Sequence, residues 1–120
     1  MDNNSNYKES FVFATLATIS VNTEQIDLTN NSLIVVTAAG VITGTYVSDK
    51  MKEALEDDAT YITFENIGTL AKKACDNAQK TILLTNVTLI TSQGIENHFA
   101  YLYVFVDDIL ALSYGTFTKN

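Results

Sequence analysis

The sequence predicts a mainly β fold with an inserted helical segment, in the α+β class, and three observations support this. Runs of β-branched and aromatic residues, separated by Gly or by Asn/Asp/Ser clusters, occupy much of the chain. The segment at about residues 49–80 instead has helical periodicity. Finally, 120 residues with 47% hydrophobic content are enough for one core, and no linker or repeat divides them. We expect a flexible tail at residues 1–8 and a single domain at residues 9–120.

The N-terminal part of the domain is expected to contain a strand and then a hairpin. Apolar residues recur at alternate positions in Phe11–Val21, which is a strand period, although Phe11–Leu16 alone would also suit the start of a short helix. Two β-branched runs in Leu33–Val47 flank Gly40, which can supply the positive φ of a tight turn. Gly44 lies inside the second run and indicates a bulge or sharp bend, as a small barrel needs at its corners.

The helical insertion is expected to begin directly after this hairpin, at about residue 49. Ser48 or Asp49 can cap a short helix that continues to about Asp57. Tyr61–Phe64 is expected to be a short strand or an extended link.

A second helix is expected at Glu65–Lys80, where small apolar residues recur at helical spacing. The stripe consists of Ile67, Leu70, Ala71, Ala74 and Ala78. Its alanines predict close packing against a flat partner, which we expect to be the sheet. Cys75 borders the stripe and is expected to be a buried, inert thiol.

The C-terminal third predicts three strands, at Thr81–Thr91, Phe99–Val106 and Ile109–Tyr114. The second strand is apolar on both faces, which indicates that both are covered. One of these faces carries four aromatic side chains, those of Phe99, Tyr101, Tyr103 and Phe105. Tyr and Phe are enriched in interfaces, so this face is the candidate for self-association into a homo-oligomer, or for binding another protein. The inserted helix is the alternative that could cover the same face.

The composition makes several functions improbable. The formal net charge is −7 and the basic residues are all lysines, which opposes binding to nucleic acid or to an anionic membrane. The single histidine, His98, lies in a polar loop, where no scaffold would arrange Ser92 and Glu96 into a catalytic triad. One cysteine and one histidine cannot form a zinc site. We therefore predict a non-enzymatic protein without catalytic residues, cofactor or metal.

The same sequence suggests a cytoplasmic location. A single cysteine cannot form an internal disulfide, so nothing indicates an oxidising compartment. The apolar run Phe11–Val21 is shorter than the roughly 20 residues that span a bilayer. It also lacks the basic flank and the cleavage site of a signal peptide.

The segment Val104–Leu112 is similar to the second signature of Sm-like proteins. Val104, Asp107, Ile109 and Leu112 match that signature, whereas Phe105-Val106 replace its Arg-Gly pair. Upstream, Gly40, Gly44 and Asp49 resemble the first Sm signature, with its turn glycine, strand glycine and aspartate. The resemblance implies a strongly bent five-stranded Sm-like or SH3-like barrel that joins subunits through its last strands, often into rings. It does not imply RNA binding, because in the family the Arg-Gly pair holds the nucleotide.

Three hypotheses on function follow from these observations. The first is a non-enzymatic small barrel that self-associates and serves as a protein-interaction or scaffold subunit. The second is an Sm-like RNA-binding protein that uses its tyrosines and few lysines, since bases can stack on aromatic rings. The third is an enzyme or small-ligand carrier with a pocket between the helix and the sheet.

Overall fold

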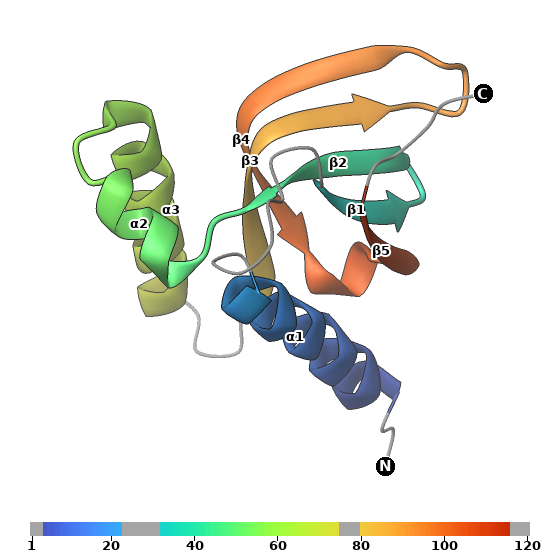
Figure 1. Cartoon of the computed structure of the whole chain (residues 1–120), viewed down its shortest axis with the longest axis horizontal. Helices are drawn as coiled ribbons and strands as arrows, with labels where there is room; N and C mark the ends of the chain where they lie inside the picture. Colours follow the sequence, from blue (N-terminus) through green and yellow to red (C-terminus); the bar gives the residue numbers. More distant parts are fainter. Residues whose placement is uncertain (1–3, 23–31, 75–79, 116–120) are drawn as a thin grey trace.

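The sheet is assembled from strands on both sides of the helical insertion. A computed structural model describes residues 4–22, 32–74 and 80–115 (Figure 1). In chain order, its elements are α1 (Asn4–Asn22), β1 (Ser32–Thr37), β2 (Gly40–Tyr46), α2 (Asp49–Ala54), α3 (Ala59–Ala74), β3 (Thr81–Ile90), β4 (Glu96–Phe105), the 3₁₀ turn η1 (Val106–Asp108) and β5 (Ala111–Gly115). The strands form one antiparallel, five-stranded sheet in the order β4-β3-β2-β1-β5. The mixed α+β class is confirmed, but β4 and β5 are edges and the sheet is not closed into a barrel.

The predicted strand at Phe11–Val21 is wrong, because this segment belongs to α1. Val12, Leu16 and Ile19 recur at helical spacing and pack into the main core, in which the first two are buried. Three hydroxyl groups in α1 donate to the carbonyl oxygen four residues earlier, which satisfies them inside a helix. Burial of one helical face thus outweighs the strand propensity of a Thr-rich sequence. The helix begins at Asn4, within the segment for which the sequence predicts a flexible tail.

β1 and β2 form the predicted hairpin, with Thr37 opposite Gly40 across a tight turn. Gly40 has a φ of +144°, a conformation that residues with a Cβ rarely adopt. A Cβ at this position would also lie 2.3 Å from the carbonyl oxygen of Ile90 in β3. Glycine is therefore required here both by the turn and by the close approach of β3.

The sheet bends at a bulge opposite Gly44, as the sequence predicts. Thr43 pairs with Thr88 and Thr45 with Thr85, so two residues of β3 face one residue of β2. One of the two is Asn86, which has a φ of +55°. The extra residue changes which positions of β3 reach the core, from Ile82 and Leu84 before the bulge to Val87 after it. A Cβ on Gly44 would lie 3.2 Å from Cγ2 of Val87, so this glycine lets the strands pack closely at the bend.

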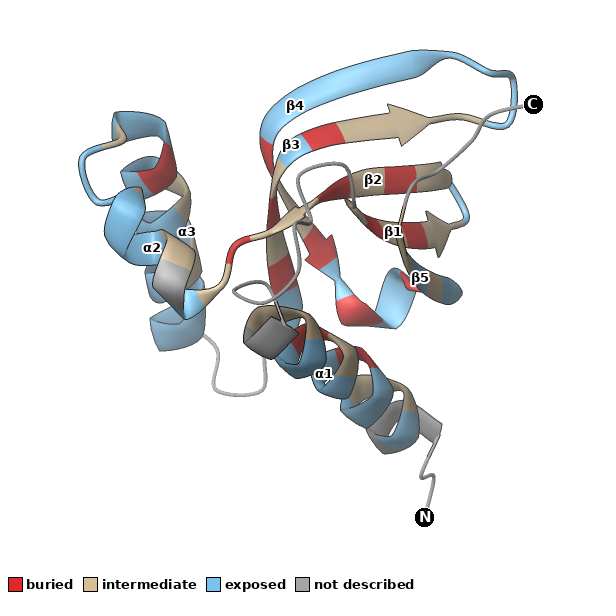
Figure 2. Ribbon diagram, viewed as in Figure 1, coloured by how far each residue is buried: buried red, intermediate tan, exposed pale blue. Residues whose placement is uncertain are grey.

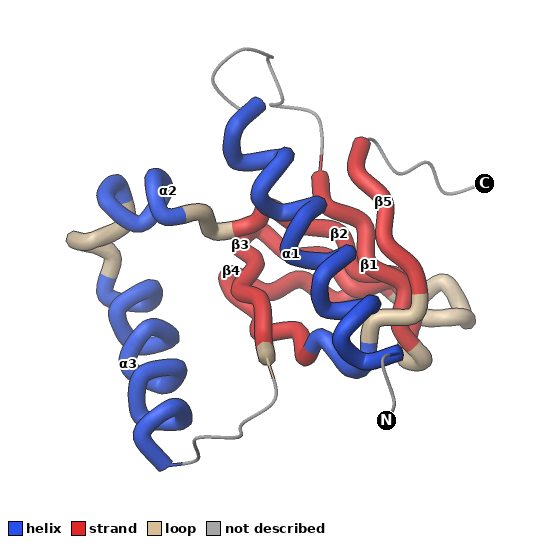
Figure 3. The backbone as a smooth tube through the Cα atoms, turned by 90° about the horizontal axis from the view of Figure 1, so that it is seen from below, coloured by secondary structure: helices blue, strands red, loops and turns tan. Residues whose placement is uncertain are grey.

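The two faces of the sheet carry separate hydrophobic clusters. Figure 2 shows buried segments in the strands, in α1 and in α3. The main core lies between α1 and the sheet and includes Leu84 and partly buried Leu102. The second cluster includes Leu83 and Tyr101, the preceding residues on the same two strands. Because successive side chains of a strand point to opposite faces, α1 covers one face of β3 and β4 and the insertion covers the other. Figure 3 shows α1 and α3 well separated around the strands.

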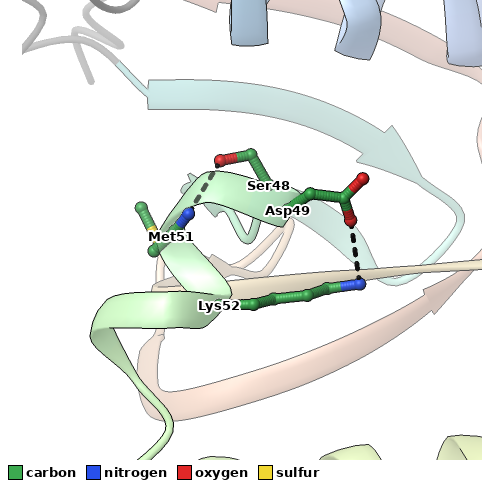
Figure 4. A network of polar contacts seen from close by, with 4 residues as sticks. All are labelled: Ser48, Asp49, Met51 and Lys52. Carbon is green, nitrogen blue, oxygen red and sulfur yellow. Dashed lines mark hydrogen bonds and ion pairs between the residues drawn. The ribbon is translucent and has the colours of Figure 1, made fainter.

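The insertion between β2 and β3 begins with the short helix α2. The hydroxyl of Ser48 accepts a hydrogen bond from the backbone N–H of Met51 at 3.3 Å and so caps the helix (Figure 4). Asp49 and Lys52 form an ion pair at 3.2 Å on its exposed side. α2 ends at Ala54, one turn before the predicted end near residue 57.

Candidate functional site

The aromatic face of β4, defined as Phe99, Tyr101, Tyr103 and Phe105, is divided between two environments. Tyr101 is 6% exposed and Tyr103 is partly buried, and both contact α3. Phe99 and Phe105 remain 40% and 47% exposed. Of the two covers that the sequence allows, the inserted helix is thus the one that lies over the tyrosines. The two phenylalanines are the members of this face that a partner can still reach.

The Tyr101 hydroxyl anchors the start of α3. It donates a hydrogen bond to Oδ2 of Asp58 at 2.8 Å, while Oδ1 of the same carboxylate accepts from the N–H of Thr60 at 2.9 Å and of Tyr61 at 3.4 Å. Asp58 is therefore both the N-cap of α3 and its link to β4. The hydrogen bond from Tyr101 is the main cause that lowers the pKa of Asp58, and the two backbone N–H groups add to it. Burial, reinforced by Asp58, raises the pKa of Tyr101.

A second tyrosine holds the middle of α3. The Tyr103 hydroxyl donates to the carbonyl oxygen of Phe64, one to two turns into the helix. The Phe64 ring lies between the two tyrosines of β4, with centroid distances of 5.6 Å to Tyr101 and 6.0 Å to Tyr103. Gly68 is the next residue of α3 on this side, and a Cβ there would lie only 2.7 Å from the Tyr103 hydroxyl oxygen. The missing side chain of Gly68 is what admits that hydroxyl.

Tyr61 completes this aromatic contact from the first turn of α3. It is 2% exposed, and its ring centroid lies 6.1 Å from that of Tyr101. Burial, followed by a hydrogen bond with Glu65, raises the pKa of Tyr61 to about 12. Burial also raises the pKa of Tyr101 and of Tyr103, so the two hydroxyls that hold α3 on the sheet remain hydrogen-bond donors to a higher pH than an ordinary tyrosine.

The predicted packing stripe of α3 is wrong, because Ile67, Leu70, Ala71 and Ala74 are all exposed. The side that faces β4 carries Tyr61, Phe64 and Gly68 instead. The reason lies in the size of the β4 side chains: two tyrosines project from the sheet, so α3 needs aromatic partners and a glycine gap rather than alanines. Ala78 and Cys75, and with them the predicted buried thiol, lie outside the described residues.

The outer edge of β4 is open. β4 pairs with β3 on one side, and no other described strand lies on its second side. The N–H of Val106 donates to the carbonyl oxygen of Lys80 at 2.9 Å, toward β3. Because peptide groups alternate along an antiparallel strand, the N–H of Phe105 lies at the open edge. β5, which pairs with β1 in the described structure, forms the second open edge at the opposite end of the sheet.

The other candidate residues lie apart from this cluster. His98, whose Nδ1 lies 3.1 Å from the Thr88 hydroxyl, is exposed on the distal part of β4. The described part of the chain contains no group of three or more His, Cys, Asp or Glu side chains that could hold a metal. Sequence reasoning gave neither Asp58 nor Gly68 a role in holding α3, and it interpreted Asp57-Asp58 as a solvated pair. An aspartate directly before a helical Ala-Thr pair is an N-cap signal, whereas nothing in the sequence marks the partner of Gly68.

Comparison of the chain with known proteins found no matching protein family, no similar curated protein and no similar solved structure. Within residues 4–22, 32–74 and 80–115, no helix combines the length and the apolar character needed to cross a bilayer.

Proposed function

We propose that this protein is a non-enzymatic, self-associating interaction subunit, a bent Sm-like or SH3-like sheet whose last strands join copies into a homo-oligomer. The observation that carries the proposal is the pair of open edges, β4 and β5, on one sheet. An open edge presents unpaired N–H and C=O groups that another chain can pair with. β4 is ten residues long, and the exposed rings of Phe99 and Phe105 add apolar contact area on the same strand.

The two edges differ, so the kind of assembly depends on which of them meet. If β4 of one copy pairs with β5 of the next, each copy uses two different surfaces, and the contact is heterologous. Heterologous contacts generate rings when the rotation between copies closes. The resemblance of residues 104–112 to the second Sm signature supports this arrangement, because Sm-like proteins join subunits through their last strands.

Phe105 offers a specific test of the edge. Its φ is −79°, which proline accepts without strain, and its N–H lies at the open edge. Phe105→Pro therefore removes an edge donor while leaving the β3–β4 pairing intact. Phe105→Val is the matched control, since it also removes the ring but keeps the N–H.

The measurement is light scattering coupled to size-exclusion chromatography, with protein loaded at about 50 μM, a concentration at which micromolar contacts persist. We expect the wild type and Phe105→Val to have a mass of several chains, and Phe105→Pro to fall to a dimer or monomer. A monomeric wild type would refute self-association. An unchanged mass for Phe105→Pro would refute the role of the β4 edge.

A further inference from the structure

α1 has one buried side and one side that no described part of the chain covers. Val12 and Leu16 are each 2% exposed against the sheet. The opposite half of the helix, which we call the outer face of α1, consists of Tyr7, Ser10, Phe11, Phe13, Ala14, Ala17 and Thr18. All seven side chains are exposed, and at 100° per residue they fall within half of the helix circumference. Figure 2 shows exposed residues along the side of α1 that is turned away from the strands.

The outer face of α1 carries no charge, which is unusual for a helix surface in contact with water. Lys8 and Glu9 are the charged residues of α1, and both are directed toward the body of the protein. The Lys8 ammonium group donates to the carbonyl oxygen of Asp107 at 3.2 Å, and the Glu9 carboxylate lies 3.8 Å from the Lys80 ammonium group. The charges of this helix therefore meet η1 and the residue before β3, and they leave its outer face uncharged.

Three aromatic side chains dominate the outer face. Tyr7, Phe11 and Phe13 are 69%, 59% and 37% exposed, and the rings of Tyr7 and Phe11 meet edge to face at 5.7 Å. An aromatic side chain has roughly 200 Å² of surface, so the three expose roughly 330 Å² together. With its four small residues, the outer face offers roughly 500 Å², or about 1,000 Å² when two copies meet, which is the lower limit for a specific interface.

We propose that the outer face of α1 is a second homotypic interface, on which α1 of another copy packs antiparallel about a two-fold axis. A two-fold contact needs a self-complementary surface, and this face has one. Tyr7 and Phe11 lie in its first half, Phe13 lies near its middle, and the remainder carries the small residues Ala14, Ala17 and Thr18. In an antiparallel pair, the rings of one helix lie over the small residues of the other.

Charge favours a second copy as the occupant of this face. Two chains of net charge −7 repel wherever their acidic surfaces meet, whereas the outer face of α1 brings no like charges together. A basic partner would find no carboxylate on it to pair with. The interface is independent of the strand edges, so together they would link edge-joined assemblies in pairs.

The test uses the Phe105→Pro chain, in which pairing through the β4 edge is blocked. Sedimentation velocity from about 10 to about 500 μM covers micromolar dissociation constants. We expect a monomer–dimer equilibrium in this background. Adding Phe11→Glu, or separately Ala14→Lys, should raise the dimer dissociation constant at least about tenfold, because each puts a charge into an apolar contact. Both residues are exposed in the monomer, so folding should be preserved.

The two variants also distinguish loss of the α1 contact from an effect of net charge, because Phe11→Glu makes the chain more negative and Ala14→Lys makes it less negative. Leu70→Glu, at a 65% exposed position of α3, is the control that should leave the equilibrium unchanged. The proposal is refuted if the Phe105→Pro chain stays monomeric throughout the range, or if neither α1 variant weakens the dimer. If Phe105→Pro does not alter the wild-type assembly, only the proposal on the β4 edge is refuted. The α1 variants are then measured in the wild-type chain instead.

Discussion

The contact between Gly68 and the Tyr103 hydroxyl makes a quantitative prediction about how α3 is held on the sheet. In an exposed helix interior, replacing glycine by alanine stabilises by roughly 1 kcal/mol. At Gly68, however, the added Cβ would lie 2.7 Å from the Tyr103 oxygen, which must then move away from the Phe64 carbonyl. Losing that hydrogen bond costs roughly 1 kcal/mol. The two effects nearly cancel, so we expect Gly68→Ala to change the free energy of unfolding by less than about 0.5 kcal/mol.

When the Tyr103 hydroxyl is removed first, the stabilisation that alanine gives a helix should become measurable. In Tyr103→Phe the nearest ring carbon would lie 3.5 Å from the new Cβ, an ordinary contact distance. Gly68→Ala should then stabilise by roughly 1 kcal/mol, which gives a coupling energy of roughly 1 kcal/mol between the two positions. Thr69→Ala, on the neighbouring exposed position, is the control and should have the same effect in both backgrounds.

The assay is urea denaturation followed by far-UV circular dichroism, with every variant at one protein concentration, because the stability of an associating protein depends on concentration. A Gly68→Ala effect that is equal with and without the Tyr103 hydroxyl would refute the contact between α3 and β4.

Three further predictions concern the tyrosine cluster, the bulge and nucleic acid. Folding raises the pKa values of Tyr61 and Tyr101, so their contribution to stability should be complete below about pH 10 and should decrease as the pH rises toward about 12. Urea titrations across this range should show the loss, and in Tyr61→Phe the free energy of unfolding should fall less steeply with pH. At Asn86, where φ is positive, alanine should destabilise by roughly 1 kcal/mol and glycine by much less, as measured by thermal denaturation; equal stability of the two variants would exclude the positive φ. Labelled uridine-rich and adenine-rich oligomers should not bind at micromolar concentration in low salt, and salt-dependent anisotropy changes there would contradict this.

The sequence predicts the local backbone features well wherever one residue type decides them. Gly40 marks the hairpin turn because glycine adopts its positive φ without strain. Gly44 marks the bend because only a residue without a side chain lets β3 approach so closely inside a strand. Ser48 marks the start of α2 because its hydroxyl meets the N–H of Met51 within the same turn. The turn at Gly40 and the cap at Ser48 involve only residues a few positions away, so the sequence shows them directly, whereas the close approaches at Gly40 and Gly44 come from β3.

Periodicity is less decisive for segments that are apolar on more than one side. The alternating residues of Phe11–Val21 fit a strand, yet Val12, Leu16 and Ile19 fit a helix equally well, and the core selects the helix. In the candidate site, the aromatic pattern of β4 is visible in the sequence. The sequence does not show that α3 covers the two tyrosines while the two phenylalanines stay exposed. Asp58 lies 43 residues from the tyrosine that binds it, and no local pattern connects the two.

The sequence by itself determined the elements whose geometry is set by one residue or by a clear alternation: the β1–β2 hairpin, the bend at Gly44 and the aromatic strand β4. It also determined an acidic chain of net charge −7, which opposes binding to nucleic acid. Only the tertiary structure decided which of several apolar faces became buried. Burial free energy depends on the area that two surfaces remove from water together, so an apolar stripe has no fixed partner until the fold supplies one. α3 turned Phe64 rather than its alanines toward β4 because two tyrosines projected from that strand, and α1 kept its aromatic face outside because its opposite side already filled the core.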